Sequence, residues 1–286
     1  IIYIKHLKGA IQMIGDMQKW TPNVAGIIEH AREIHPKTEI ISRLVSGEIH
    51  RSNYEKVCIR SRKLASALEK DGVKKGDVIA TLALNTYRHL EMYYGISGMG
   101  AITHTLNFRL HPEQAVYIIN HAEDKIIFVE LPFVPILEAL QENLKTVEKY
   151  VVLCEVDEMP ETTLKNAISY EEYIQDGDEN YSWPTLEDDA ACALCYTSGT
   201  TGNPKGVLYS HKSNVIHAQA ALTAMTIKPD DTILMVVPLF HVLAWGIPYF
   251  GPMNGLKLVM PGMQMEGEPL FELIDQEDVT LAFGVP

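Results

Sequence analysis

One short segment, residues 196–206, constrains the fold more than any other part of the chain. It has the sequence Tyr-Thr-Ser-Gly-Thr-Thr-Gly-Asn-Pro-Lys-Gly and lies between two apolar runs. Glycines let the backbone turn and bring its N–H groups close to an anion, while the hydroxyl side chains add donors and Lys205 adds positive charge. Pro204 favours an extended conformation at Asn203, which stiffens the approach to the lysine. The segment therefore predicts a phosphate-binding turn between two strands.

The same segment differs from a P-loop. The spacing from Gly199 to Lys205 fits, but Pro204 precedes the lysine and Gly206 follows it, so the hydroxyl that would bind magnesium is missing. Residues 207–209 have the β-branched and aromatic character of a strand rather than of a first helical turn. These differences argue against a P-loop NTPase. On composition alone, a plain glycine-rich turn between two strands stays an alternative.

Composition sets broad limits. The chain has 286 residues, of which 47% are hydrophobic, enough for a large core or for two joined lobes. A net charge of −13 without a basic cluster argues against nucleic acid or an anionic membrane surface as a partner. Four cysteines in so long a chain do not indicate a disulfide framework, so we expect a reducing, cytoplasmic location. No run of eighteen apolar residues occurs, so no transmembrane segment is expected.

Helical and strand patterns alternate along the chain. Thr21 and Pro22 predict the start of a helix that ends at Ile34, and Ser52 or Asn53 caps a helix that ends near residue 70. Strands are predicted at 77–84, 126–130, 190–195, 207–211, 232–237, 256–260 and 279–283, and helices at 87–99, 112–121 and 213–225. The alternation predicts an α/β fold with largely parallel sheets flanked by helices.

A change in composition suggests how the chain divides. Residues 155–189 are acidic, contain Pro160, Gly177 and Pro184, and show little apolar periodicity, so we expect a junction between two lobes there. We predict an N-terminal extension over 1–20 that is not native to the fold, a first α/β lobe over 21–185 and a second over 186–286. Because a strand pattern runs almost to the last residue, we also expect the chain to be a fragment.

Two motifs carry a resemblance to a known family. Residues 196–207 resemble the phosphate-loop signature of the adenylate-forming (AMP-binding) superfamily, which includes acyl-CoA synthetases, aryl-CoA ligases, luciferases and the adenylation domains of peptide synthetases. Residues 238–245, Pro-Leu-Phe-His-Val-Leu-Ala-Trp, resemble the acid-pocket helix of that superfamily and are most similar to the fatty-acid–CoA ligase branch. The resemblance implies two α/β lobes followed by a small barrel and a mobile C-terminal domain, before which this chain would end.

The resemblance also implies a reaction. A carboxylate would attack the α-phosphorus of ATP to give an acyl-adenylate and pyrophosphate, and coenzyme A would then take the acyl group as a thioester. Mg²⁺ would arrive with ATP, no protein metal site is expected, and a homodimer is compatible with the family. Lys205 and His241 would be catalytic. The nucleotide would be bound by Thr197, Ser198, Gly199, Thr200, Thr201, Gly202 and Lys205, and the acid by Phe240, His241 and Trp245.

The acid-pocket motif also bears on the substrate. Amino-acid-activating domains place an aspartate after the phenylalanine, whereas Phe240 is followed by His241, so no counter-charge for an ammonium group is present. The apolar neighbours suit a hydrocarbon chain, and aryl acids stay open. If residues 239–249 are helical, His241 and Trp245 share one face. The alternatives are that both residues are structural, and that the chain is a non-catalytic nucleotide-binding fragment.

Other candidate groups are assigned ordinary roles. Cys192 and Cys195 have the spacing of a redox or metal motif, but an offset of three residues in a strand sends the two side chains to opposite faces. His104, His211 and His217 lack metal-ligand spacing, so we interpret them as structural or exposed.

Overall fold

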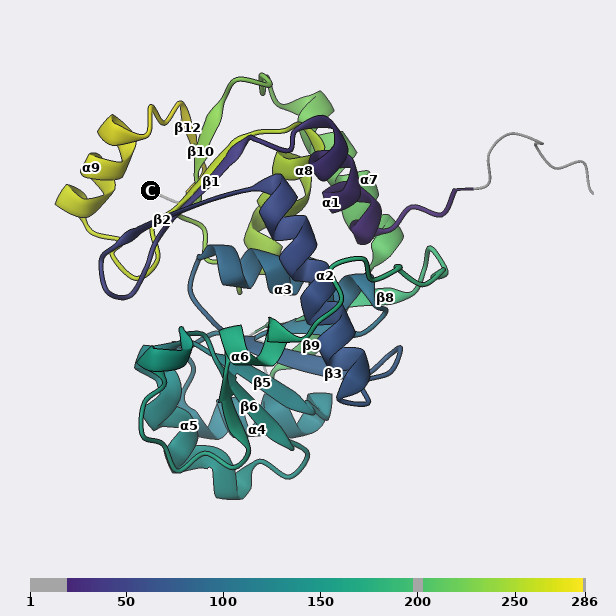
Figure 1. Cartoon of the computed structure of the whole chain (residues 1–286), viewed down its shortest axis with the longest axis vertical. Coiled ribbons are helices and arrows are strands. Elements are labelled where there is room, and N and C mark those ends of the chain that lie inside the picture. The colour runs from purple at the N-terminus through teal and green to yellow at the C-terminus, as the bar shows by residue number, and fades with distance from the viewer. Residues whose placement is uncertain (1–19, 198–202, 285–286) are drawn as a thin grey trace, which may run out of the picture.

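The computed structural model describes residues 20–197 and 203–284. Twelve strands in this part of the chain form two sheets (Figure 1). Sheet A has the order β12-β10-β11-β1-β2 and consists of β1 (Glu39–Arg43), β2 (Ile49–Asn53), β10 (Thr232–Leu234), β11 (Lys257–Met260) and β12 (Leu281–Ala282). Sheet B has the order β7-β6-β5-β3-β4-β8-β9 and consists of β3 (Val78–Leu82), β4 (Ile102–Thr105), β5 (Ile126–Val129), β6 (Lys149–Val152), β7 (Ala167–Ser169), β8 (Ala191–Thr197) and β9 (Lys205–Ser210).

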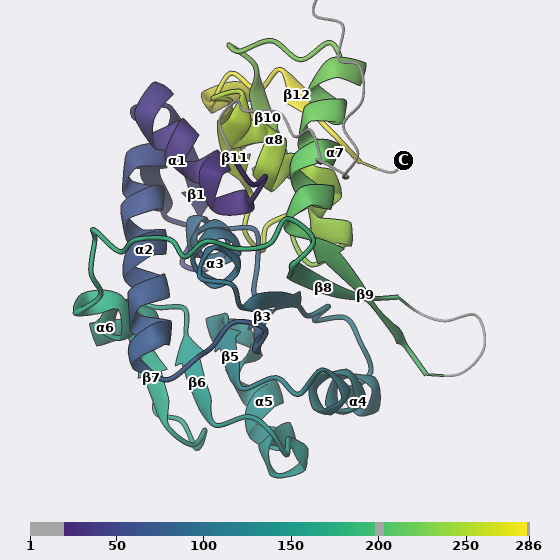
Figure 2. The same cartoon turned by 90° about the vertical axis from the view of Figure 1, so that its right-hand side faces the viewer.

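Helices separate and cover the two sheets (Figures 1 and 2). The described helices are α1 (Val24–Ile34), α2 (Tyr54–Lys70), α3 (Tyr87–Gly98), α4 (Pro112–Ala122), α5 (Val134–Leu140), α6 (Tyr170–Gln175), α7 (His211–Ala224), α8 (Ile247–Met253) and α9 (Gly267–Gln276). Every residue of α3 is buried, as expected for a helix that contacts strands of both sheets. The outer face of sheet B packs against α4 and α5, and the outer face of sheet A packs against α9.

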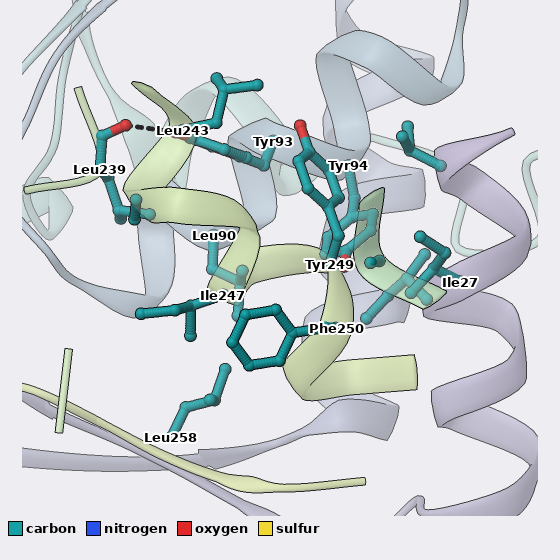
Figure 3. Packing of buried hydrophobic residues seen from close by; sticks show 14 of the residues in the cluster. Ile27, Leu90, Tyr93, Tyr94, Leu239, Leu243, Ile247, Tyr249, Phe250 and Leu258 are labelled. Atoms are coloured by element: carbon teal, nitrogen blue, oxygen red, sulfur yellow. Dashed lines mark hydrogen bonds between the residues drawn. The ribbon is translucent and has the colours of Figure 1, made fainter. Parts of the chain in front are cut away.

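The central strands of the two sheets are buried on both faces, and successive side chains point to opposite faces. Ile40 of β1 points into the core shared with α1 and α8, part of which Figure 3 shows, whereas Ile41 points to the α9 side. In β3, Ile79 packs against α2 and α3 while Ala80 packs against α4. Burial on both faces explains why these strands have nearly continuous apolar sequences.

Apart from residues 239–249, the helices and strands that we predicted are confirmed in type, with shifts at their ends. Helix α2 begins after Asn53, whose side chain accepts a hydrogen bond from the Lys56 N–H at 2.9 Å. The predicted N-cap of α1 was wrong: Asn23, rather than Thr21, accepts the Gly26 N–H, also at 2.9 Å. The region 155–189 is also more regular than expected, because it contains β7 and α6.

The sheets do not follow the predicted division at residue 185. Strands β1 and β2 come early in the chain yet pair into sheet A, where β1 is parallel to β11, while β8 and β9 join sheet B beside β4. Two pairs, β1–β2 and β8–β9, are antiparallel. An apolar pattern indicates that a segment is a strand but does not indicate which strand it pairs with. The division into lobes over 21–185 and 186–286 therefore stays a prediction about domains and does not describe the two sheets.

Two further observations concern a possible membrane span and the four cysteines. Within the described ranges, no helix is long and apolar enough to cross a membrane. The cysteines Cys58, Cys154, Cys192 and Cys195 are buried free thiols. Cys192 accepts a hydrogen bond from the Asn214 amide at 3.1 Å, and Cys195 Sγ lies 3.4 Å from the Thr105 hydroxyl, so the two thiols of the Cys-X-X-Cys spacing have separate partners.

Candidate active site

The segment predicted to bind phosphate lies between β8 and β9, an antiparallel pair at one edge of sheet B (Figure 2). In this antiparallel pair Thr197 lies opposite Lys205, and both side chains are exposed. The strand predicted after the turn is present as β9, which supports the distinction from a P-loop. Of the residues predicted to bind phosphate, Thr197 and Lys205 face each other at the base of the turn. Ser198, Gly199, Thr200, Thr201 and Gly202 lie outside the described residues.

Tyr196 lies near the end of β8 and connects the β8–β9 hairpin to α4. Its hydroxyl lies 2.6 Å from Nδ1 of His121 in α4, and its ring centroid lies 5.1 Å from that of the buried His104. Burial raises the pKa of Tyr196 to about 12, and the nearby Asp124 carboxylate adds to the rise, so the phenol keeps its proton at neutral pH. A Cβ at Gly206 would lie 3.3 Å from the Tyr196 Cζ atom, so the glycine permits the close approach of β9.

The second motif does not form the continuous helix over residues 239–249 on which a shared face for His241 and Trp245 would depend. Val242 to Trp245 have φ angles of 44°, 53°, 48° and 56°, which form a left-handed turn, and α8 begins only at Ile247. Pro248 explains the boundary: it lacks the N–H that would bond to the Ala244 carbonyl in a continuous helix, and it is tolerated in the first turn of α8. His241 and Trp245 therefore do not share a helix face.

Both motifs meet at one cavity of about 360 Å³. Phe240, His241 and Val242 line it from the second motif, and Tyr196, Thr197 and Pro204 line it from the hairpin. The remaining lining residues are Thr105, Asn107, Leu110, Gln114, Ile118, Cys195 and Tyr209.

Trp245 packs instead against the large core that contains α1 and α8. The prediction that Trp245 helps to bind the acid substrate is based only on the family resemblance. His241, in contrast, has an exposed side chain in the cavity wall.

Our sequence reasoning missed the contribution of β4 and α4. Thr105 is the last residue of β4 and donates a hydrogen bond from Oγ1 to the Phe240 carbonyl at 3.3 Å. Asn107 follows at the same strand end, and Gln114 lies in the first turn of α4. Ligands of parallel α/β sheets bind beyond the carboxyl ends of the strands, but β4 was not among the strands that we predicted, so the sequence analysis gave no signal for Asn107.

The chemistry of the cavity favours an anionic ligand. Its described walls carry hydroxyl, amide and imidazole groups and no carboxylate, and Lys205 stands beside Pro204 at the hairpin base. In the part of the chain that the structure describes, no cluster of three or more His, Cys, Asp or Glu residues could hold a metal ion.

A second, apolar cavity of about 260 Å³ adjoins the first. Asn107, Leu110 and Ile118 line both cavities, and the second extends between α4 and α5 toward Ile136 and Leu140. The polar site therefore borders on space suited to an apolar group.

The three histidines interpreted as structural lie apart from the cavity lining. His104 is fully buried, with Nδ1 at 2.8 Å from the Asp124 carboxylate, and His211 Nδ1 accepts the Val24 N–H at 3.3 Å. Burial lowers the pKa of His211 to about 4, so it is neutral at physiological pH. His217 Nε2 lies 3.2 Å from the Trp245 carbonyl and supports the left-handed turn.

Comparison with known proteins agrees with this geometry. The family model described as "AMP-binding enzyme" matches residues 28–286. The medium-chain-fatty-acid–CoA ligase of Ectopseudomonas oleovorans is 45% identical over 276 residues, which cover 96% of this chain and 50% of the relative. The long-chain-fatty-acid–CoA ligase of Thermus thermophilus is 41% identical and is matched over 92% of this chain and 48% of its own length. The chain thus spans about half the length of these curated relatives.

A solved structure shows the same fold. The anthranilate CoA ligase AuaEII, crystallised with anthranoyl-AMP, superposes with a TM-score of 0.80 over 95% of this chain and 51% of that one. Its sequence identity is 22%, so this likeness concerns the fold.

Proposed function

The chain belongs to the AMP-binding enzyme family, and we propose that it serves the ATP-dependent activation of a fatty acid to an acyl-adenylate and then to an acyl-CoA thioester. The observation that carries the proposal is the convergence of the hairpin and the second motif on one cavity. Residues 196–197 and 240–242 are far apart in sequence, yet they line the same space. This arrangement would hold a triphosphate and a carboxylate close enough to react.

The residues would act by positioning and charge. Lys205 and the Thr197 hydroxyl would bind the phosphates at the base of the hairpin and stabilise negative charge on the leaving pyrophosphate. His241 would orient the carboxylate toward the α-phosphorus. Magnesium would come as the counter-ion of ATP, because the described cavity walls offer no carboxylate ligand of their own.

The choice of a fatty acid has two supports. Relatives at 45% and 41% identity carry fatty-acid–CoA ligase names, and the adjoining cavity between α4 and α5 is apolar. A cytoplasmic location and a homodimer belong to the same proposal and are expectations from the resemblance. An aryl acid is the alternative substrate, which a panel of acids would distinguish.

The test compares the wild-type protein from the complete gene with Lys205→Ala. Loss of a charge-assisted phosphate contact weakens binding by roughly 10- to 100-fold, so we expect ATP affinity in calorimetry to fall by that factor. Lys212→Ala is the matched control, because Lys212 is an exposed lysine on α7 paired with Asp188 at 2.8 Å. Unchanged ATP affinity in Lys205→Ala would remove the lysine from the site.

The substrate is tested by pyrophosphate release with octanoate, palmitate and benzoate. Release with the fatty acids and CoA supports the proposal. Release with benzoate alone would select the aryl-acid alternative. ATP binding without release for any acid would favour a non-catalytic nucleotide-binding protein.

A further inference from the structure

We propose that Asn85 is a positioning residue for the acid-binding segment, residues 238–242. Its carboxamide, at the end of a sheet B strand, holds the backbone that leads from sheet A to His241. The inference builds on the proposed function, in which His241 orients the carboxylate. Asn85 itself does not line the cavity beside His241, so it would act through the backbone that it binds.

Three hydrogen bonds join this one side chain to the alternate residues 235, 237 and 239, which lead into the acid-binding segment. Asn85 Nδ2 donates to the Met235 carbonyl at 2.7 Å and to the Val237 carbonyl at 2.9 Å. Its Oδ1 accepts the Leu239 N–H at 2.8 Å. In extended backbone the polar groups of alternate residues face the same side, so the amide binds the segment as a neighbouring strand would.

The position of Asn85 links the two sheets. It lies three residues beyond the end of β3 in sheet B, and its side chain is buried. Its own carbonyl accepts the Gly262 N–H at 3.2 Å, just after β11 of sheet A. Both amide protons and the side-chain oxygen of Asn85 have hydrogen-bond partners. A substitution of Asn85 would therefore leave the buried carbonyl groups of Met235 and Val237 and the N–H of Leu239 without partners.

Two neighbours extend this attachment toward the cavity. The Tyr93 hydroxyl of α3 donates to the Leu239 carbonyl, a contact drawn in Figure 3, and Thr105 Oγ1 donates to the Phe240 carbonyl at 3.3 Å. The backbone from 235 to 240 is thereby tied to sheet B and α3 up to the residue before His241.

The left-handed turn explains why this attachment matters. Four consecutive non-glycine residues, 242–245, have φ between 44° and 56°, a conformation that L-residues avoid and that persists only where neighbours enforce it. Downstream, His217 contacts the Trp245 carbonyl, and the Tyr94 hydroxyl donates to the Pro248 carbonyl. Asn85 supplies the largest number of hydrogen bonds on the upstream side. Without it, relaxation of the turn would displace His241 and Val242, which line the cavity.

The kinetic test uses Asn85→Asp and Asn85→Ala in the full gene product. Asn85→Asp keeps the size and the acceptor but turns a carboxylate oxygen toward two carbonyls. We expect kcat/KM for the acid in pyrophosphate release to fall by roughly 10- to 100-fold at pH 7.5, while KM for ATP changes less than about twofold. Asn214→Ala removes another buried amide, bonded to Cys192, and is the control expected to keep wild-type kinetics.

The pH dependence of Asn85→Asp tests the positioning role when kcat/KM is expressed per folded protein, because protonation of a buried carboxylate also restores stability. Protonation at low pH would restore one donor, so the ratio of variant to wild-type kcat/KM should rise as pH falls from 8 to 5.5. Equal losses in both variants without a change in any KM would indicate merely less folded protein and would overturn the inference.

Hydrogen exchange tests the same inference without activity. In Asn85→Ala the Leu239 N–H loses its acceptor, so exchange in a peptide spanning 235–245 should accelerate at least tenfold while a peptide from β4 keeps its protection. Unchanged protection there would overturn the role of Asn85. A wild-type protein without acid-dependent pyrophosphate release would instead refute the proposed function, and the exchange result would still decide the case of Asn85.

Discussion

Glu130 should make the stability of this protein depend on pH in the direction opposite to that of most carboxylates. It follows β5, its side chain is buried, and its Oε2 accepts the Leu84 N–H at 3.2 Å, next to Asn85. Burial raises the pKa of Glu130 to about 7 from the ordinary value of 4.5, against the opposing effects of that hydrogen bond and of Arg88. The carboxyl group is therefore protonated in the folded protein at pH 6.

The direction and the size of the effect of Glu130 on the unfolding free energy follow from proton linkage. Between pH 4.5 and 7 the folded state keeps a proton that the unfolded state has released, so the stabilising contribution is complete below pH 4.5 and is lost as pH rises through 7. The difference of 7 − 4.5 = 2.5 pKa units corresponds to roughly 3 kcal/mol of unfolding free energy. Glu130→Gln keeps a neutral acceptor for Leu84 at every pH and should lack this loss.

The assay is urea unfolding of the wild type and Glu130→Gln at pH 5, 6, 7 and 8. The stability of the variant relative to the wild type should rise by roughly 2–3 kcal/mol across this range, most steeply between pH 5 and 6.5, and should level off above pH 7. Taking the difference cancels the other titrating groups that the two proteins share. Glu142→Gln, which changes an exposed carboxylate paired with Lys165, is the control and should show no such trend. A constant difference between Glu130→Gln and the wild type would refute the reasoning, because it would mean that Glu130 is ionised throughout.

Two other substitutions test close contacts inside the fold, one between α2 and α3 and one between the end of β1 and the residues that follow β11. Arg60→Ala should lower the thermal midpoint by an amount equivalent to about 3–5 kcal/mol of unfolding free energy. The reason is that the substitution leaves the fully buried Glu91 carboxylate, which Arg60 Nε contacts at 2.7 Å, without its ion-pair partner. A loss below about 1 kcal/mol in calorimetry would mean that Glu91 is already neutral. Gly262→Ala should cost at least about 1–3 kcal/mol in urea unfolding, since its φ is +62° and a Cβ would lie 2.2 Å from the Arg43 carbonyl oxygen. Wild-type stability in that variant would show that the backbone can move away.

The sequence predicts this fold well wherever local patterns decide the structure. Helix α2 carries an apolar face, an asparagine cap and an Asp-Gly end, and it was predicted with nearly correct bounds. The buried strands β3, β5 and β11 were recognised as apolar runs, whereas the buried strands β4 and β6 were missed. The β1–β2 hairpin was missed because β2 exposes Arg51 and carries polar residues over most of its length. The pairing of β1 with β11 connects residues more than 200 positions apart, which no local pattern encodes.

The candidate site was predictable in its two motifs and not in its surroundings. Residues 196–206 and 238–245 carry recognisable sequences, whereas Thr105 and Gln114 enter the cavity only because β4 lies beside β8. The condition that residues 239–249 form one helix is not met, because Pro248 favours a new helix start over a continuous helix, a local rule that the apolar pattern obscured.

The location of the cavity follows from the arrangement of the two sheets. The hairpin belongs to sheet B, while His241 follows β10 of sheet A, so neither motif can form the site without a fixed relation between the sheets. The two sheets are held in this arrangement by buried hydrogen bonds as well as by apolar packing. The carboxamide of Asn85 makes three of these hydrogen bonds. Apolar packing is non-directional and tolerates small sliding, whereas hydrogen bonds to chosen carbonyls and N–H groups fix the register of the segment. Asn85, placed at this junction, can therefore fix the distance between the proposed phosphate-binding turn and the proposed acid-binding segment, a distance on which the proposed adenylation would depend.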